Sequence, residues 1–170
     1  MLGVFPKSEH GATYTLKTNV AASPRSLITR AEYRISQRHS LNDFVKMKVM
    51  DCPFCNPSRP VICSNESAIA IRDAFPVAEG HTLVIPKDHE PDITKVSSVV
   101  YQDCFELVRV VADNLIEELS PAGINIGVNI GEAAGQTIDH AHIHVIPRYD
   151  GDTPNPRGGV RGVIPGKADY

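Results

Sequence analysis

Three of the chain's seven histidines lie at alternate positions of one short stretch, DHAHIHVIPRYDGD. They are His140, His142 and His144, and the residues between and directly after them are apolar. In an extended strand, residues i, i+2 and i+4 share one face, so this spacing predicts a row of imidazoles. A strand is a rigid support, and a rigid support is where a precise chemical site is best held.

Three interpretations of this row compete. Neutral imidazoles on a strand are good ligands for zinc. An imidazole can instead attack an electrophilic phosphorus or carbonyl, while a hydrogen bond to its other nitrogen fixes the tautomer. A neighbouring imidazole can then bind or protonate the leaving group. The third interpretation is a solvated strand face that carries histidines by chance, which the density of histidine in this stretch disfavours.

The loop just upstream, NIGEAAGQT, favours chemistry at phosphorus. Gly131 and Gly135 allow the backbone to turn tightly, and Asn129 and Gln136 supply amide donors. Loops of this kind bring backbone N–H groups close to a phosphate, whose transfer needs donors that are already in place. Arg148, beyond the row, could add a cation, although the aspartates that follow it could neutralise that charge.

The elements that must position these residues form an α+β pattern. Apolar residues recur at three- and four-residue steps from Val99 to Leu119, which predicts one long amphipathic helix. Short apolar or alternating segments bounded by Pro and Gly predict strands. We expect an antiparallel β-sheet meander with the helix between its second and third strands. The predicted strands span residues 67–73, 81–87, 124–130 and 140–147.

Charge separates the first fifty residues from the rest of the chain. They carry eight Lys and Arg against three Asp and Glu, whereas the whole chain has a net charge of −3. We expect residues 1–46 to be an N-terminal extension that is disordered or not native, although frequent Arg and Ser would also suit a mitochondrial transit peptide. Residues 47–152 would form the domain, and 153–170 would be a tail packed on it.

Several partners and compartments are disfavoured by the same composition. The chain has no apolar run long enough to span a bilayer, and its start has no apolar core of the secretory type. We therefore expect a cytoplasmic protein with no membrane partner. The mild positive charge of the first segment is expected to be solvated, so no nucleic-acid partner is predicted.

The stretch His140-Ala-His142-Ile-His144-Val-Ile resembles the motif of the histidine triad (HIT) family, His-φ-His-φ-His-φ-φ with φ apolar. GEAAGQT before it, IPR after it and IAIRDAFPVAEGHTLVIPKDH further upstream are similar to one branch of that family. This branch contains the fragile histidine triad dinucleoside polyphosphate hydrolases and many bacterial relatives. The resemblance runs from about Cys52 to Asp152, and it implies a HIT-like fold.

The resemblance also implies a function. HIT enzymes of this branch cleave at the α-phosphate of a nucleotide through a covalent nucleotidyl-histidine and release a nucleoside monophosphate. Matched by motif, His142 would be the nucleophile, and His144 and Gln136 would contact the phosphate and the leaving atoms. Asp73 would bind the ribose hydroxyls, since a carboxylate can accept two hydrogen bonds at once. Asn129 would lie near the leaving group.

The base of the nucleotide would need an apolar pocket. Ile69, Ile71, Phe75 and Ile85 could line it, although each of them could equally be ordinary core. His81, in EGHTL, is expected to be structural, with a side chain that caps or fills its turn.

A pair of cysteines adds a possible metal site. Cys52-Pro-Phe-Cys55 has the two-residue gap of a zinc half-site. In HIT relatives that bind structural zinc, the other ligands are a histidine after the Pro-Lys turn and the first triad histidine. Here these are His89 and His140. His140 is also one of the candidate catalytic residues. Such a closed site would stiffen the strand that carries His142; the alternative is two reduced thiols or a redox pair.

Other functions remain open at the level of sequence. The Gln136-Thr137 pair favours the polyphosphate branch, because the phosphoramidase branch more often has serine there and Gly-Gly where this chain has Pro147-Arg148. A purine nucleoside phosphoramidase, a dinucleoside polyphosphate phosphorylase and a nucleotide-binding regulatory protein are alternatives. A metal-dependent hydrolase would use all three triad histidines as ligands. The resemblance also implies a homodimer paired through the long helix and an edge strand.

Overall fold

The structure is a computed structural model, and it describes residues 51–168. The predictions for residues 1–46, a disordered extension or a transit peptide, therefore lie outside the described residues. Within the described part of the chain, none of the helices combines the length and the apolarity needed to span a bilayer.

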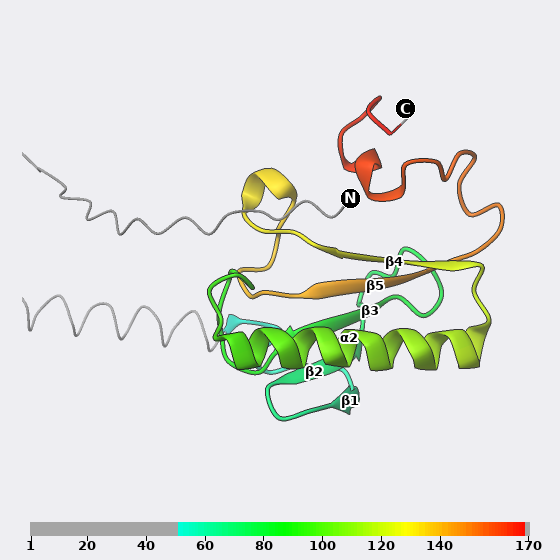
Figure 1. The fold of residues 1–170 in the computed structure, drawn as a ribbon. Helices are drawn as coiled ribbons and strands as arrows, with labels where there is room; N and C mark the ends of the chain where they lie inside the picture. The colour runs from blue at the N-terminus through cyan, green and yellow to red at the C-terminus, as the bar shows by residue number, and fades with distance from the viewer. Residues whose placement is uncertain (1–50, 169–170) are drawn as a thin grey trace, which may run out of the picture. The chain divides into compact units, whose positions relative to one another are not determined.

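Five strands form one antiparallel sheet, and one long helix, α2 (Ser98–Leu119), lies across one of its faces (Figure 1). The order of the strands across the sheet is β1-β2-β3-β5-β4. Because β5 is antiparallel to both of its neighbours, β3 and β4 run in the same direction. The strands are β1 (Val61–Ser64), β2 (Ala68–Arg72), β3 (Thr82–Pro86), β4 (Gly123–Val128) and β5 (Ile143–Arg148).

The predicted α+β class, with one long helix on an antiparallel sheet, is confirmed, but the strand order differs from a simple meander. The last strand, β5, is inserted between β3 and β4 rather than added at the edge. The physical reason is the pair of connections: parallel strands such as β3 and β4 need a long crossover, here containing α2, which leaves room for a strand between them. In addition, β1 was missed, because its four residues are mostly exposed and carry little pattern.

The helix begins and ends close to its predicted limits. Ser97 caps its start, where the side-chain oxygen accepts a hydrogen bond from the backbone N–H of Val100 (3.3 Å). Ser120 ends it in the left-handed conformation (φ 47°) and donates its N–H to Ile116. The residues that α2 buries recur at three- and four-residue steps, as predicted: Cys104, Leu107, Val108, Val111 and Leu115.

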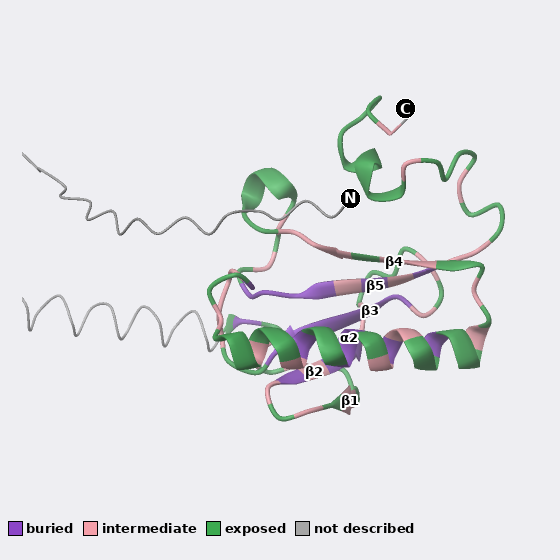
Figure 2. Ribbon diagram, viewed as in Figure 1, coloured by how far each residue is buried: buried purple, intermediate pink, exposed green. Residues whose placement is uncertain are grey.

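Apolar clusters lie on both faces of the sheet, and the smaller one lies on the face that carries the candidate site. The larger one joins α2 to the sheet residues Ala70, Val84 and Ile143, and the ribbon in Figure 2 is purple at the buried residues of α2 and of the strands behind it. On the opposite face, Ile71, Leu83 and Ile85 form a smaller cluster, against which Phe54 and Ile69 pack. Leu83 is aligned with Ile71 on one side and with His144 on the other, so His144 belongs to this second face.

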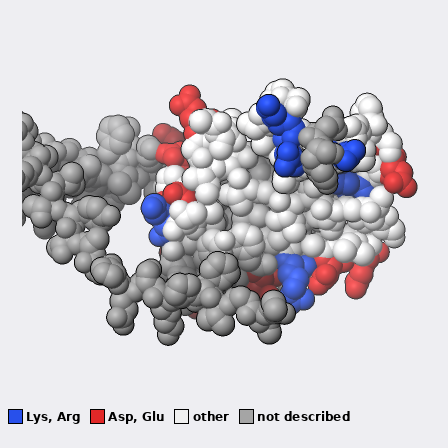
Figure 3. All heavy atoms as spheres, turned by 45° about the horizontal axis from the view of Figure 1, so that its top comes forward, with Lys and Arg blue, Asp and Glu red and all other residues white. Residues whose placement is uncertain are grey.

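Exposed apolar side chains lie on α2 and around β4. Figure 3 shows that, on the face drawn, groups of basic and acidic residues are separated by uncharged surface. The homodimer that the sequence suggests would use these two elements, and it stays a prediction. The exposed apolar residues on or next to α2 and β4 are Val99, Tyr101, Phe105, Ile116, Ile126 and Ile130.

An ion pair between Arg148 and Asp152 lies where the C-terminal tail begins. Arg148 donates through Nε and Nη2 to the two carboxylate oxygens of Asp152, both at 2.7 Å, so the cation beyond the triad is neutralised. A short 3-10 turn, η2 (Gly159–Val163), then lies beside β4, with most of its side chains exposed.

Candidate active site and metal centre

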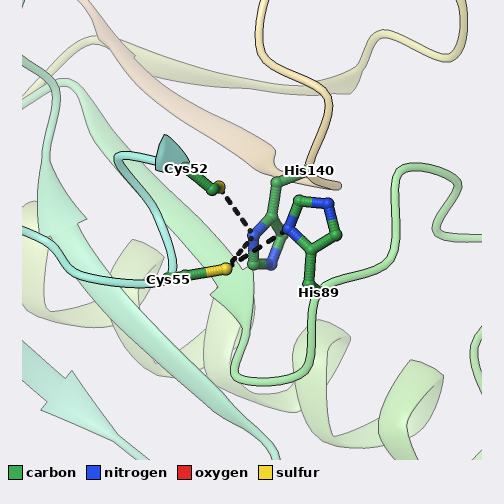
Figure 4. Close-up of side chains that lie close together, drawn as sticks. All are labelled: Cys52, Cys55, His89 and His140. Carbon is green, nitrogen blue, oxygen red and sulfur yellow. Dashed lines mark hydrogen bonds between the residues drawn. The ribbon is translucent and has the colours of Figure 1, made fainter. Parts of the chain in front are cut away.

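Two thiols and two imidazoles from three separate segments converge beside β3 and β5 (Figure 4). The Nδ1 atom of His140 lies 3.4 Å from Sγ of Cys52 and 3.6 Å from Sγ of Cys55. Sγ of Cys55 is also 3.3 Å from Nδ1 of His89. One ligand atom from each of the four residues lies within 4.8 Å of all the others. The structure therefore brings together the whole set that the sequence suggested.

The hydrogen bonds and charges of this cluster fit a soft divalent cation. Nε2 of His140 is 2.9 Å from the carbonyl oxygen of Pro86, so the proton sits on Nε2 and the lone pair of Nδ1 faces the thiols. Burial and the neighbouring Cys52 raise the pKa of the Cys55 thiol, so a thiolate there needs a cation to stabilise it. Nε2 of His89 is buried without a partner among the described residues.

His142 is buried, and one of its ring nitrogens is held by the backbone. Its Nδ1 lies 2.9 Å from the carbonyl oxygen of His140, which is an acceptor only, so Nδ1 carries the proton. The lone pair is therefore on Nε2, and the residue lines a pocket on the sheet face away from α2. The ring of Phe54 packs edge-on against it, with 5.1 Å between ring centroids.

His144 contacts His81, and His81 lies next to Asp73. Nε2 of His81 lies 3.0 Å from Nδ1 of His144, and Nδ1 of His81 lies 3.3 Å from Oδ2 of Asp73. The backbone N–H of Val77 donates to Nδ1 of His81 (3.3 Å), so in neutral His81 the proton is on Nε2 and no hydrogen bond joins Nδ1 to the Asp73 carboxylate. His81 then donates to Nδ1 of His144, and His144 keeps its own proton on Nε2. His81 caps its turn as expected, but the sequence did not reveal its contact with the triad.

Burial keeps these imidazoles neutral. Burial, followed by the neighbouring rings of His142 and His81, lowers the pKa of His144 to about 4. Burial also lowers the pKa of His81, although the carboxylate of Asp73 opposes this shift. Near pH 7 both rings are therefore neutral, and the N–H of His81 points towards His144.

The geometry does not favour a single metal site made from the triad. Two groups of described residues have ligand atoms close enough for a metal, and they divide the triad: one contains His140, the other contains Asp73, His81 and His144, and neither contains His142. Within the second group, His81 presents opposite ring nitrogens to its two partners. The two ring nitrogens therefore point away from each other, so the three residues do not direct their ligand atoms at one point.

A pocket of about 360 Å³ opens beside His142 and His144. Asp73 is on its wall, with Oδ1 accepting a hydrogen bond from the backbone N–H of Phe75 (2.9 Å). Of the residues suggested for a base pocket, Ile71 and Phe75 line it, whereas Ile69 and Ile85 belong to the apolar cluster around it. The sequence did not single out several other lining residues: Pro53, Phe54, Pro57, Arg59, Leu83, Thr137 and Ile138.

The glycine loop upstream of the triad is organised by Gln136. Its Oε1 accepts from the backbone N–H of Gly131 (2.8 Å), and its Nε2 donates to the carbonyls of Pro91 (2.8 Å) and Ile138 (3.1 Å). Gly131 has a positive φ of 80°, a conformation that favours glycine. The side chain of Gln136 is therefore engaged with the backbone, and Asn129 is also outside the residues that line the pocket.

Comparison with known proteins agrees with this geometry. The family model described as HIT domain matches residues 56–151. The chain belongs to the HIT family. An uncharacterized HIT-like protein of Mycoplasma genitalium is 41% identical over 110 residues, which cover 62% of this chain and 78% of the relative. The crystal structure of a Zn-bound histidine triad family protein from Mycobacterium smegmatis is similar, with a TM-score of 0.57 and 36% identity over 63% of this chain and 81% of that one.

Two further HIT relatives carry names that state an activity. Adenylylsulfatase HINT3 of Arabidopsis thaliana is 33% identical over 107 residues, which cover 60% of this chain and 54% of the relative. Adenosine 5'-monophosphoramidase hnt1 of Schizosaccharomyces pombe is 33% identical over 104 residues, which cover 58% of this chain and 75% of the relative. Both names describe enzymes that act on adenylyl compounds.

Proposed function

We propose that this HIT protein is a hydrolase or transferase that cleaves dinucleoside polyphosphates, or related nucleotidyl compounds, at the α-phosphate. The observation that carries the proposal is the tautomer of His142. Its Nδ1 proton is committed to the carbonyl oxygen of His140 at 2.9 Å, which leaves the Nε2 lone pair at the wall of a pocket that could hold a nucleotide. A neutral imidazole oriented in this way is a competent nucleophile.

The reaction would proceed in two steps. Nε2 of His142 attacks the α-phosphorus, a P–N bond forms, and the bond from phosphorus to the leaving group breaks. The N–H at Nε2 of His144 donates a hydrogen bond to the leaving oxygen, which departs as a phosphate anion, and the hydrogen bond from His81 fixes that N–H in place. Water then attacks phosphorus and loses a proton to solvent, the P–N bond breaks, and a nucleoside monophosphate leaves with neutral His142 restored.

The rest of the pocket would hold the nucleoside. Asp73 would accept the ribose hydroxyls through the lone pairs that its hydrogen bond from the N–H of Phe75 leaves free. Ile71 and Phe75 would contact the base. Gln136 and Asn129 would contact the phosphate and the leaving group. For Gln136 this requires that its side chain exchange its present hydrogen bonds with the backbone for bonds to the substrate.

We assign the cluster of Cys52, Cys55, His89 and His140 to a structural zinc ion. Two thiolates and two imidazoles would supply a closed set of four protein ligands, and the lone pair of Nδ1 in His140 already faces the thiols. A bound zinc ion would supply rigidity here and no chemistry, because a four-ligand protein site leaves no position for substrate.

The test is product formation from diadenosine triphosphate, diadenosine tetraphosphate and adenosine phosphoramidate, followed by chromatography. Wild-type protein should release AMP, and His142→Ala should not. A short exposure to chelator should leave turnover almost unchanged. Rapid acid quenching should trap a protein whose mass is increased by one adenylyl group. If His142→Ala keeps turnover while chelator abolishes it, the covalent-histidine proposal is wrong.

One alternative has a specific observation in its favour. The relative from Schizosaccharomyces pombe is named as a monophosphoramidase, and the chemistry at phosphorus is shared between the two reactions. The ratio of kcat/KM for adenosine phosphoramidate to that for the diadenosine polyphosphates separates them. A ratio above one assigns the chain to P–N cleavage, with His142 and His144 in the same roles.

A further inference from the structure

The loop that contains the two thiols is also a wall of the nucleotide pocket. Pro53 and Phe54 lie between Cys52 and Cys55 in the chain and line the pocket, and three residues just after Cys55 line it as well: Pro57, Ser58 and Arg59. The candidate metal site and the candidate nucleotide site therefore share one short segment of chain.

Phe54 touches both sites with the same ring. Its ring centroid is 5.1 Å from that of His142, with an interplanar angle of 67°, and 6.0 Å from that of His140, with an angle of 70°. The ring also packs against the apolar cluster formed by Ile71, Leu83 and Ile85, which backs the pocket. Displacement of Phe54 would therefore disturb both the nucleophile and the pocket wall.

A second connection runs through the backbone. His140 offers its ring to the thiols, and its carbonyl oxygen holds Nδ1 of His142. A shift of His140 would therefore move the hydrogen bond that fixes the tautomer of His142. The metal cluster thus reaches the nucleophile by two routes, through Phe54 and through the carbonyl of His140.

The segment from Cys52 to Arg59 contains no helix or strand, so no ladder of regular backbone hydrogen bonds holds it in place. The thiols contact the imidazoles at 3.3 to 3.6 Å, and thiols form weak hydrogen bonds. Arg59 donates to the carbonyl oxygens of Asp73 (3.2 Å) and Ala74 (3.4 Å) at the surface. A metal bound by both thiols would order this segment, and a nucleotide packed against it would do the same.

We infer that Phe54 is a positioning residue through which metal and nucleotide binding stabilise each other. This inference rests on the proposed function. Because such coupling is reciprocal, zinc must raise the affinity for AMP by the same factor by which AMP raises the affinity for zinc. We expect a factor of about 10, within the range common for coupled sites.

The experiment uses the full chain, zinc and AMP. AMP is titrated by calorimetry into zinc-loaded and chelator-stripped protein, and zinc affinity is measured against a chromophoric chelator with and without saturating AMP. Because stripped protein could unfold, the time course of zinc loss from loaded protein to the chelator is also followed. AMP should slow that loss, by up to about 10-fold when the coupling acts on the dissociation rate, and this arm needs no folded metal-free state.

Two variants and one control assign the effect to Phe54. In Phe54→Ala the coupling factor should fall to near one although all four metal ligands remain, and Phe54→Leu should recover part of it. Phe105→Ala removes an aromatic ring from α2, on the opposite face of the sheet, and should keep the wild-type factor. A wild-type level of coupling in Phe54→Ala overturns the assignment of Phe54.

The outcomes also separate this inference from the proposed function. If wild-type protein binds zinc and AMP but shows a factor of one, the coupling is wrong and the proposed function stands. If the protein takes up no zinc, the coupling is again wrong, while hydrolysis can still be measured. If it neither binds AMP nor releases it from any substrate, the proposed function fails, and this inference fails with it.

Discussion

His140 and His142 carry the same side chain two residues apart, yet their rings are held in opposite tautomers. His140 donates from Nε2 to the carbonyl oxygen of Pro86, and its Nδ1 lone pair faces two thiols. His142 donates from Nδ1 to the carbonyl oxygen of His140, and its Nε2 lone pair is left for the pocket. In each case a backbone carbonyl has selected the nitrogen that can act.

The surroundings of the two rings differ in the same sense. His140 lies among soft ligands in a closed cluster, which suits a metal that stays in place. His142 lies beside a pocket and beside the neutral, hydrogen-bonded pair His144 and His81, which suits chemistry on a bound substrate. The segment that leads into β5 therefore serves two purposes. The carbonyl oxygen that each ring meets leaves a different ring nitrogen free.

The largest expected effect comes from removing one ring at a time. His142→Ala should lower kcat by about 10⁴-fold or more, since loss of a nucleophile removes the covalent step, while zinc content stays at that of the wild type. His140→Ala should lose zinc. The checks are steady-state kinetics and zinc measured by native mass spectrometry on the same samples. Loss of zinc in His142→Ala, with full activity, would reverse the two assignments.

Removal of the metal tests the assignment of His140 to a closed metal site. If zinc is present at 1,000 times its dissociation constant, it adds about 4 kcal/mol to the free energy of unfolding. For a domain of this size, chelation or Cys55→Ser should then lower Tm by roughly 10 °C. Cys63→Ser is the matched control, because Cys63 lies on β1 outside the cluster. Equal melting curves with and without chelator would argue against a metal at these four residues.

A change at His81 tests the assignment of His142 and His144 to chemistry at the pocket. His81→Ala removes the donor that holds Nδ1 of His144, so the proton on Nε2 of His144 is no longer fixed. We expect kcat/KM to fall about 10²-fold, with zinc content unchanged. His81→Gln, whose amide can still donate, should recover part of the loss, and the pH profile of kcat/KM should shift in the alanine variant. A profile identical to that of the wild type would limit His81 to its role in the turn.

Much of the fold was predictable because its signals are local. The periodicity of α2 and the alternation around β5 are read from neighbouring residues, and both were found within a few residues of their observed limits. The strand order was not predictable in this way. It depends on two registers at once, since His144 is aligned with Leu83 of β3 and with Gly127 of β4, and neither alignment leaves a trace in the local pattern.

Some features of the candidate site were likewise predictable from the local sequence, and others were not. The spacing of the triad and the Cys-Pro-Phe-Cys pair could be read directly from the sequence. The tautomers could not, because they depend on where the carbonyl oxygens of Pro86 and His140 lie. The contact of His81 with His144 was missed for the same reason: it is made across the antiparallel pair β3 and β5, 63 residues apart in the chain.

The smallest expected effect is a dependence of stability on pH that belongs to His144. Burial holds its pKa at about 4 in the folded protein, below the usual value of about 6.5 in an unfolded chain. Folding therefore favours the neutral ring. This contribution is complete above pH 6.5 and is lost as the pH falls from there through 4, to a total of at most about 3 kcal/mol.

Urea unfolding between pH 7.5 and 4.5 measures this contribution. The zinc ligands also bind protons in that range, so the comparison is between wild type and His144→Asn, which share the metal cluster. The free energy of unfolding should fall more steeply for the wild type as the pH is lowered. If the two slopes agree, folding does not hold His144 neutral. Its ring would then be free to carry a proton on both nitrogens, and the one-directional chain of donors from His81 would not exist in the folded protein.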